Sequence, residues 1–349
     1  MSYFRENIQK AEPYTPGEQP QDGGFIKLNT NENPYPPCRA VLAAMKQAVD
    51  ASLRLYPDPL ATKVRVKAAE VFGVTPEMVI VGNGSDDILS IIMRSFVGER
   101  DKVVYLYPSY GLYRVLTEIQ NGRGMAVQYT DAFRLPPEML QADARLTFIC
   151  SPNNPTGTIA APDEVAAFAA KTSGVVVVDE AYADFSDSSC IELVHRFENV
   201  IVIRSFSKSY SLAGLRIGLG IASASLIDGM MKVKDSYNVE RLGIVGATAA
   251  LENVHKMKAN VQKIRRDRRY LAGQLAELGF SVLPSQANFV FARPPMPAGE
   301  LYQHLKDRKI LVRYWNKPRL SDGVRISIGT RQELDALLEA VREILGSRQ

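Results

Sequence analysis

The chain has 349 residues, 46% hydrophobic and 23% charged, a composition that is typical of a globular protein of roughly two domains. A net charge of +4 argues against nucleic-acid binding, and apolar runs well short of ~18 residues argue against a membrane span. Three cysteines without a CxxC pair, three scattered histidines and no signal-peptide pattern predict a cytoplasmic protein without a disulfide framework or a metal site.

The first part of the chain is predicted to be an extended arm. Residues 1–37 are rich in Pro, Gly and Asn and show no helical period, so we expect them to lie over a domain or a partner subunit and to begin a small domain. Helical patterns follow at 38–51 and 61–73, with a turn at residues 56–59 between them.

Seven short apolar runs then alternate with amphipathic stretches. They are bounded by Gly, Pro, Asn and Asp, and uniformly apolar strands of this kind predict a mostly parallel sheet that is covered on both faces. We therefore expect an α/β fold with a large domain at 38–253 and a seven-stranded sheet. The predicted strands are 78–81, 102–106, 125–129, 146–150, 175–178, 200–203 and 217–221.

The pattern changes after about residue 223. A charged helix is predicted at 253–278, and helices near 299–308 and 331–346 alternate with four strands, which predicts a small α+β domain at 254–349. These strands are expected at 280–283, 288–291, 310–314 and 324–328.

Chemistry-bearing residues follow several of the predicted strands. Asp179 ends a buried strand, at the edge where open α/β sheets bind ligands, although it could also be a helix N-cap. Lys208 lies among Ser residues after the next strand, and Arg216 lies between two glycines, where its guanidinium could bind a phosphate. A solvated basic loop is the alternative.

Two further loops are candidate anion or amide sites. Gly82-Asn83-Gly84-Ser85 precedes a helix and offers backbone N–H groups to one phosphate. Because Asp87 replaces the third glycine of GxGxxG, an NAD-dependent dehydrogenase is disfavoured. Residues 151–157, SPNNPTG, are either a plain turn or a rigid mount for Asn154 at the sheet edge.

Asn154, Asp179 and Lys208, in this order and spacing, resemble the fold type I pyridoxal-phosphate aminotransferases of class II. Within them the chain looks most similar to the histidinol-phosphate aminotransferase family, over nearly its whole length. The segments that carry this likeness include PYTPG (13–17), LNTNENPYPP (28–37), RLYPDP (54–59), VGNGSDDIL (81–89), YPSYGLY (107–113), RSFSKSYSLAGLRIG (204–218) and VRISIGT (324–330).

The resemblance implies roles for individual residues. Lys208 would react with the cofactor aldehyde and then act as general acid and base, with burial and a cation such as Arg216 lowering its pKa. Asp179 would pair with the pyridinium nitrogen. Asn154 and Tyr182 would bind the phenolate oxygen. The other implied contacts are Tyr110 on the ring face, the phosphate ligands Gly84, Ser85, Asp86, Ser205, Ser207 and Arg216, and Tyr56 on the cofactor of the neighbouring subunit in a homodimer.

Substrate recognition would depend on arginines. Arg325 and Arg313 are the expected anion ligands, and Tyr14, Asn29 and Tyr237 would line the side-chain and phosphate end of the site. Arg313 could instead be a salt-bridged strand residue.

The implied reaction converts L-histidinol phosphate and 2-oxoglutarate to imidazole-acetol phosphate and L-glutamate, a transamination of histidine biosynthesis. An aromatic-amino-acid aminotransferase and a threonine-phosphate decarboxylase of the same fold are the alternatives among enzymes. A regulatory DNA-binding protein that uses the same fold is disfavoured, because the chain has no spare ~70 residues for a helix-turn-helix module.

Overall fold

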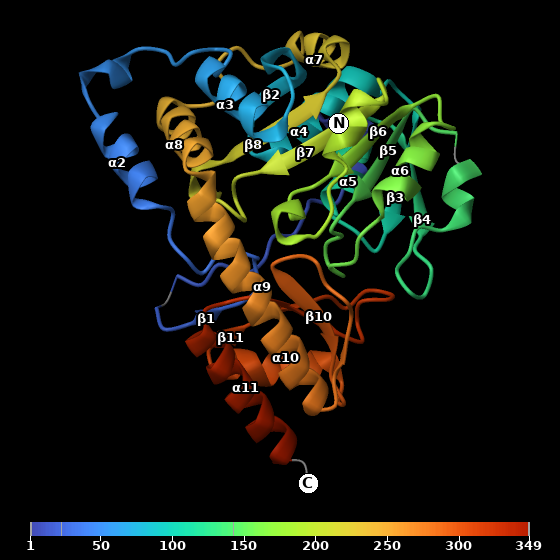
Figure 1. Ribbon diagram of the computed structural model, residues 1–349. Helices are drawn as coiled ribbons and strands as arrows, with labels where there is room; N and C mark the ends of the chain where they lie inside the picture. Colours follow the sequence, from blue (N-terminus) through green and yellow to red (C-terminus); the bar gives the residue numbers. More distant parts are fainter. Residues whose placement is uncertain (1, 22, 142, 348–349) are drawn as a thin grey trace.

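A computed structural model describes residues 2–21, 23–141 and 143–347. Its centre is a seven-stranded sheet with the strand order β2-β8-β7-β6-β5-β3-β4 (Figure 1). Strand β8 is antiparallel to both of its neighbours, whereas the other adjacent strands are parallel. The strands are β2 (Val79–Asn83), β3 (Lys102–Tyr107), β4 (Arg123–Gln128), β5 (Leu146–Cys150), β6 (Val175–Asp179), β7 (Val200–Ser205) and β8 (Ile217–Ala222).

This sheet confirms the predicted α/β fold, and each of the seven apolar runs forms one of its strands. Every residue of β5, β7 and β8 is buried, because helices cover both faces. The edge strand β4 is mostly exposed. The helices associated with the sheet are α2 (Arg39–Gln47), α3 (Thr62–Phe72), α4 (Ser85–Phe96), α5 (Leu112–Ile119), α6 (Pro162–Ala169), α7 (Ala224–Met231) and α8 (Arg241–Glu252).

The C-terminal part of the chain forms a second group of strands and helices. Four antiparallel strands, in the order β12-β13-β10-β9, pack with three helices. Figure 1 shows the longest helix, α9, running from the large sheet to this group. The elements are α9 (Val254–Glu277), β9 (Ser281–Val282), β10 (Phe289–Arg293), α10 (Ala298–Asp307), β12 (Arg313–Tyr314), β13 (Val324–Ser327) and α11 (Arg331–Gly346).

The N-terminal segment joins this second group. Strand β1 (Ile26–Lys27) pairs in parallel with β11 (Ile310–Leu311). The pairing agrees with a small domain built from both chain ends, while the boundaries at 37/38 and 253/254 stay predictions.

The arm was expected to have no helix, and this was wrong for one short stretch. Residues Glu6–Lys10 form α1, which the Asn7 side chain ties to the end of α5 by donating to the Glu118 carbonyl at 2.8 Å.

Short 3₁₀ helices lie in several loops, at Ala51–Arg54, Pro76–Met78, Pro137–Gln141, Ala183–Phe185, Ile191–His195 and Ala213–Leu215. In the part of the chain that the structure describes, no helix is long and apolar enough to cross a membrane. The same residues contain no cluster of His, Cys, Asp and Glu suited to a metal ion, and the three cysteines are free.

Candidate active site

A cavity of about 540 Å³ lies where the large sheet, the arm and the C-terminal group meet. Most of the side chains singled out from the sequence line it, although they come from segments far apart in the chain. They are Tyr14, Asn29, Ser85, Asp86, Tyr110, Asn154, Asp179, Tyr182, Ser205, Ser207, Lys208, Arg216, Arg313 and Arg325.

Lys208 lies in the loop after β7, and its ammonium donates to the carbonyl oxygen of Thr30 at 3.2 Å. Its pKa is lowered from 10.5 to about 8, chiefly by burial and next by the positive charge of Arg325. Glu32 and Asp86 act in the opposite direction, and Arg216 contributes less than Arg325. The expected depression of the pKa is therefore present, with Arg325 rather than Arg216 as the principal cation.

Asp179 ends β6 and is buried. It accepts hydrogen bonds from the Tyr113 hydroxyl at 2.7 Å and from the Ala181 amide at 3.1 Å. Burial raises its pKa to about 6, although both hydrogen bonds oppose the shift. Tyr113 was not singled out from the sequence. It is fully buried and stacks on Phe148, so that the hydroxyl which orients the carboxylate is itself held firmly.

The loop between β2 and α4 forms an anion cradle together with Arg216. Gly84 has φ +86°, and a Cβ atom there would lie 2.7 Å from Nη2 of Arg216. Arg216, with φ +54°, donates to Asp86 Oδ2 at 3.1 Å and to Ser207 Oγ at 3.4 Å. The N-terminus of α4, a guanidinium and Ser hydroxyls thus converge on one space, which suits a phosphate group. Gly84 itself shapes this loop without lining the cavity.

The Tyr110 ring covers one side of the cavity. Its hydroxyl donates to Asp86 Oδ1 at 3.1 Å, and Tyr14 of the arm meets the ring edge-on with the centroids 5.4 Å apart. Burial raises the pKa of Tyr110 far above its ordinary value, so the hydroxyl keeps its proton. The arm is therefore part of the cavity wall.

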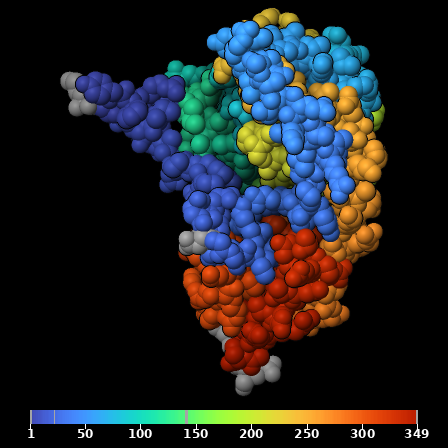
Figure 2. All heavy atoms as spheres, turned by 90° about the vertical axis from the view of Figure 1, so that its left-hand side faces the viewer, coloured from blue at the N-terminus to red at the C-terminus, as the bar shows by residue number. Residues whose placement is uncertain are grey.

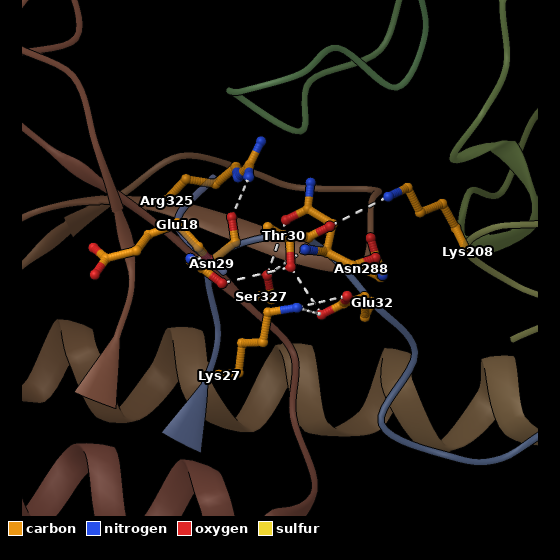
Figure 3. A network of polar contacts seen from close by, with 10 residues as sticks. Glu18, Lys27, Asn29, Thr30, Glu32, Lys208, Asn288, Arg325 and Ser327 are labelled. Carbon is orange, nitrogen blue, oxygen red and sulfur yellow. Dashed lines mark hydrogen bonds and ion pairs between the residues drawn. The ribbon is translucent and has the colours of Figure 1, made fainter. Parts of the chain in front are cut away.

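Arg325, on β13, is 6% exposed and lies beside Asn29 of the arm (Figure 3). Its guanidinium donates to Asn154 Oδ1 at 2.5 Å and to the Asn29 carbonyl at 2.7 Å, and its Cζ lies 5.3 Å from the Phe289 ring centroid and 5.2 Å from that of Trp315. Burial lowers its pKa to about 10. Among the described residues its buried Nε has no hydrogen-bond partner.

Arg313 and Asn29 make contacts that the sequence did not predict. Arg313 lines the cavity and donates to the carbonyls of Thr15 and Pro16 at 2.9 and 3.0 Å, and it forms no ion pair with the described residues, so its role as an anion ligand stays a prediction. It fastens the arm over the cavity. The amide of Asn29 donates to the Glu18 carbonyl at 2.8 Å, so Asn29 faces Arg325 through its backbone.

Tyr56 and Tyr237 do not line the cavity of their own chain. Their rings stack with the centroids 4.4 Å apart, and they are 79% and 48% exposed. The expected role of Tyr237 at the substrate end of the site stays a prediction. Figure 2 looks onto the face that carries α2 in light blue and the arm in dark blue, with a hollow between them.

Sequence reasoning missed the contacts made by residues 30–33, although the motif LNTNENPYPP was noted. Thr30 accepts from Lys208, Asn31 donates to the Tyr182 hydroxyl at 3.0 Å, and Asn33 donates to the backbone carbonyl of Lys208 at 2.9 Å. The one signal available was the unusual density of Asn in a segment without helical or strand periodicity.

Residues 24–341 match the family described as aminotransferase class I and II. The chain belongs to this family, whose members are pyridoxal-phosphate-dependent transaminases, and the predicted enzyme class and cofactor are thereby confirmed.

Within this family, the chain is similar to histidinol-phosphate aminotransferases. A histidinol-phosphate aminotransferase of Microcystis aeruginosa is 46% identical over 98% of this chain and 99% of its own length. One from Geobacter sp. is 43% identical over 99% of each chain. The crystal structure of the Sinorhizobium meliloti histidinol-phosphate aminotransferase, in complex with pyridoxal-5'-phosphate, has a TM-score of 0.91 and 28% identity over 100% of this chain and 99% of its own. The resemblance seen in the sequence is confirmed.

Proposed function

We propose that this protein transfers the amino group of L-histidinol phosphate to 2-oxoglutarate, giving imidazole-acetol phosphate and L-glutamate in histidine biosynthesis. The observation that carries the proposal is one cavity that holds a lysine of lowered pKa, a buried carboxylate and an anion cradle, with a partly unpaired arginine opposite. The choice of substrate follows from the similarity to the histidinol-phosphate aminotransferases named above. A cytoplasmic location is retained as part of this proposal.

The residues present suit pyridoxal phosphate. The absence of a Cβ atom at Gly84 lets the Arg216 guanidinium lie close against this loop, and the donors that face the cavity there suit a phosphate. Ser205, Ser207, Arg216 and the backbone amides of Ser85 and Asp86 would hold that group. Asp179 would bind the protonated ring nitrogen, whose charge would draw the carboxylate pKa down from about 6. Asn154 and Tyr182 would hold the ring oxygen, and Tyr110 would cover the ring face.

Bound pyridoxal phosphate supplies an electron sink for the electron pair that remains when Cα of the substrate loses its proton. Lys208 Nζ would take that proton and return it to C4′ of the cofactor. Because its pKa is about 8, Lys208 is uncharged often enough near neutral pH to react and to act as a base. Tyr14 and Tyr110 would shield the reacting atoms from water.

Substrate selection in this proposal depends on Arg325. A guanidinium binds a carboxylate or a phosphate through two hydrogen bonds, so one residue serves both glutamate and histidinol phosphate. Arg313 would contribute positive charge and hold the arm closed. The aromatic side chains of Tyr14, Tyr110 and Trp315 at the cavity also favour one second candidate, an aromatic-amino-acid aminotransferase.

We further propose a homodimer in which Tyr56 reaches the cofactor of the neighbouring subunit. Tyr56 lies outside the cavity of its own chain and is 79% exposed. Leu53, Leu55 and Leu60 beside it are also exposed, and a partner subunit would cover this apolar face.

The test is a single-turnover experiment with the cofactor-loaded protein. L-histidinol phosphate, L-phenylalanine and L-threonine phosphate are each mixed with it, and the loss of the visible absorbance of the bound cofactor is followed. We expect the fastest change with histidinol phosphate and none with the Lys208→Ala variant. A wide margin for phenylalanine would refute the assigned substrate, and a protein that never takes up the cofactor would refute the proposed reaction.

A further inference from the structure

Asn31 is buried between the C-terminal group and the loop that carries Tyr182. It is 1% exposed, lines the cavity, and has φ +55°, a conformation that Asn adopts more readily than most residues. All four of its polar groups are engaged. Its backbone N–H and carbonyl bind Ser327 Oγ and Asn288 Nδ2 at 2.8 and 2.9 Å, and its side chain binds Ser327 Oγ and the Tyr182 hydroxyl at 2.9 and 3.0 Å.

The direction of these hydrogen bonds follows from Ser327. The Ser327 oxygen already accepts the backbone N–H of Asn31, so its single proton goes to Oδ1 of the same residue. The amide nitrogen of Asn31 is thereby turned toward Tyr182, and the Tyr182 oxygen accepts. The opposite amide orientation would leave the buried Ser327 proton without this acceptor.

A hydroxyl oxygen that accepts from Asn31 still has its own proton to donate. Tyr182 is 6% exposed and lines the cavity, and the described residues provide no acceptor for that proton. Its ring is held edge-on by Phe289, with the centroids 5.1 Å apart, so the hydroxyl points in a defined direction. The structure therefore leaves one donor at this point of the cavity wall.

We propose that Asn31 is a positioning residue for the transamination: by donating to the Tyr182 oxygen, it reserves the Tyr182 proton for the oxygen on the cofactor ring. The inference rests on the proposed function. It also assigns a task to the N-terminal segment, whose Thr30 carbonyl accepts a hydrogen bond from Lys208 (Figure 3). Asn31 connects β13 to the cofactor-binding loop of the large sheet through a single side chain.

The test exchanges a donor for an acceptor. Asn31→Asp preserves the shape and the Ser327 contact but offers Tyr182 a carboxylate, which would take the Tyr182 proton away from the cavity. Asn31→Gly removes the side chain and tolerates the positive φ, so it serves where the carboxylate prevents folding or cofactor uptake. Tyr182→Phe is combined with each of the two Asn31 variants, which gives two double-mutant cycles.

The visible absorbance of the cofactor bound to Lys208 is measured as a function of pH without substrate. The readout is the pKa of the proton beside the ring oxygen, taken from the midpoint of this titration. Loss of a hydrogen bond to the ring oxygen leaves more negative charge there, which holds the adjacent proton more tightly. We expect Tyr182→Phe to raise this pKa by about one unit and Asn31→Asp to raise it similarly, with a smaller rise for Asn31→Gly. In the Tyr182→Phe background, Asn31→Gly should cause no further shift.

The outcomes separate the two proposals. Wild-type protein that never develops the absorbance would overturn the proposed function and this inference together. Loaded variants whose pKa equals that of the wild type would overturn the inference alone. The inference would also be overturned if the pKa shifts of Asn31→Gly and Tyr182→Phe were additive in the double variant. Additive shifts would mean that Asn31 acts independently of the Tyr182 hydroxyl, through the charges of Arg325 and Lys208 that also face Tyr182.

Discussion

The lowered pKa of Lys208 leads to a quantitative prediction for the cofactor-free protein. With a pKa of about 8, about one Lys208 side chain in ten is uncharged at pH 7, against about one in three thousand for an ordinary lysine. Only the uncharged amine attacks an aldehyde. The rate of pyridoxal-phosphate uptake should therefore rise with pH and level off above about pH 8, well below the ordinary lysine pKa of 10.5.

Arg325 is the cation that contributes most to this shift after burial. Arg325→Gln removes the charge and should raise the pKa of Lys208 by roughly one unit, which slows uptake at pH 7 about tenfold. Arg325→Lys is the matched control, because it keeps the charge and loses the planar guanidinium. Its uptake profile should stay close to that of the wild type.

The assay mixes each apoprotein with pyridoxal phosphate in a stopped-flow spectrometer from about pH 6 to about pH 10 at constant ionic strength. The midpoint of the rate profile reports the pKa of Lys208. A wild-type midpoint near 10.5 would refute the argument from burial. Equal midpoints for Arg325→Gln and the wild type would show that the charge of Arg325 does not act on Lys208.

Three further predictions concern other parts of the site. Because burial raises the pKa of Asp179 from 3.8 to about 6, the folded apoprotein binds a proton that the unfolded chain has released. The bound proton stabilises the folded state by about 3 kcal/mol below about pH 4, and this stabilisation is lost as the pH rises through 6. In urea unfolding, the free energy of unfolding of Asp179→Asn should therefore lack this decline. Tyr56→Phe should weaken cofactor binding about tenfold in equilibrium dialysis of the dimer, and unchanged binding would contradict the contact across subunits. Arg313→Ala should accelerate limited proteolysis of the arm, whereas Arg319→Ala, which removes guanidinium bonds to carbonyls outside the arm, should not.

The strands of the large sheet could be predicted from the sequence because most of them are buried on both faces. Such strands are mostly apolar, and residues 175–178 of β6 and 200–203 of β7 show this plainly. Helix α1 could not be predicted in the same way. It has five residues and no buried side chain, and contacts to α5 hold it rather than a periodic pattern of its own.

The order of residues along the chain also predicted which side chains meet at the cavity. Asp179 is the last residue of β6, and the Lys208 loop follows β7. Because these two strands are parallel, both groups lie at the same edge of the sheet. The spacing of residues within a motif can be read directly from the sequence. The resemblance to a family then indicates which chemistry such residues perform.

Tertiary structure alone decided how those residues are charged and connected. Arg325 lies more than a hundred residues from Lys208 in sequence yet affects its pKa more than Arg216 does. Arg313 binds the arm instead of lying free, and Asn31 sets the direction of a hydrogen bond to Tyr182. Electrostatic and hydrogen-bond energies depend on distances in space and on the donors already in use, neither of which sequence separation determines.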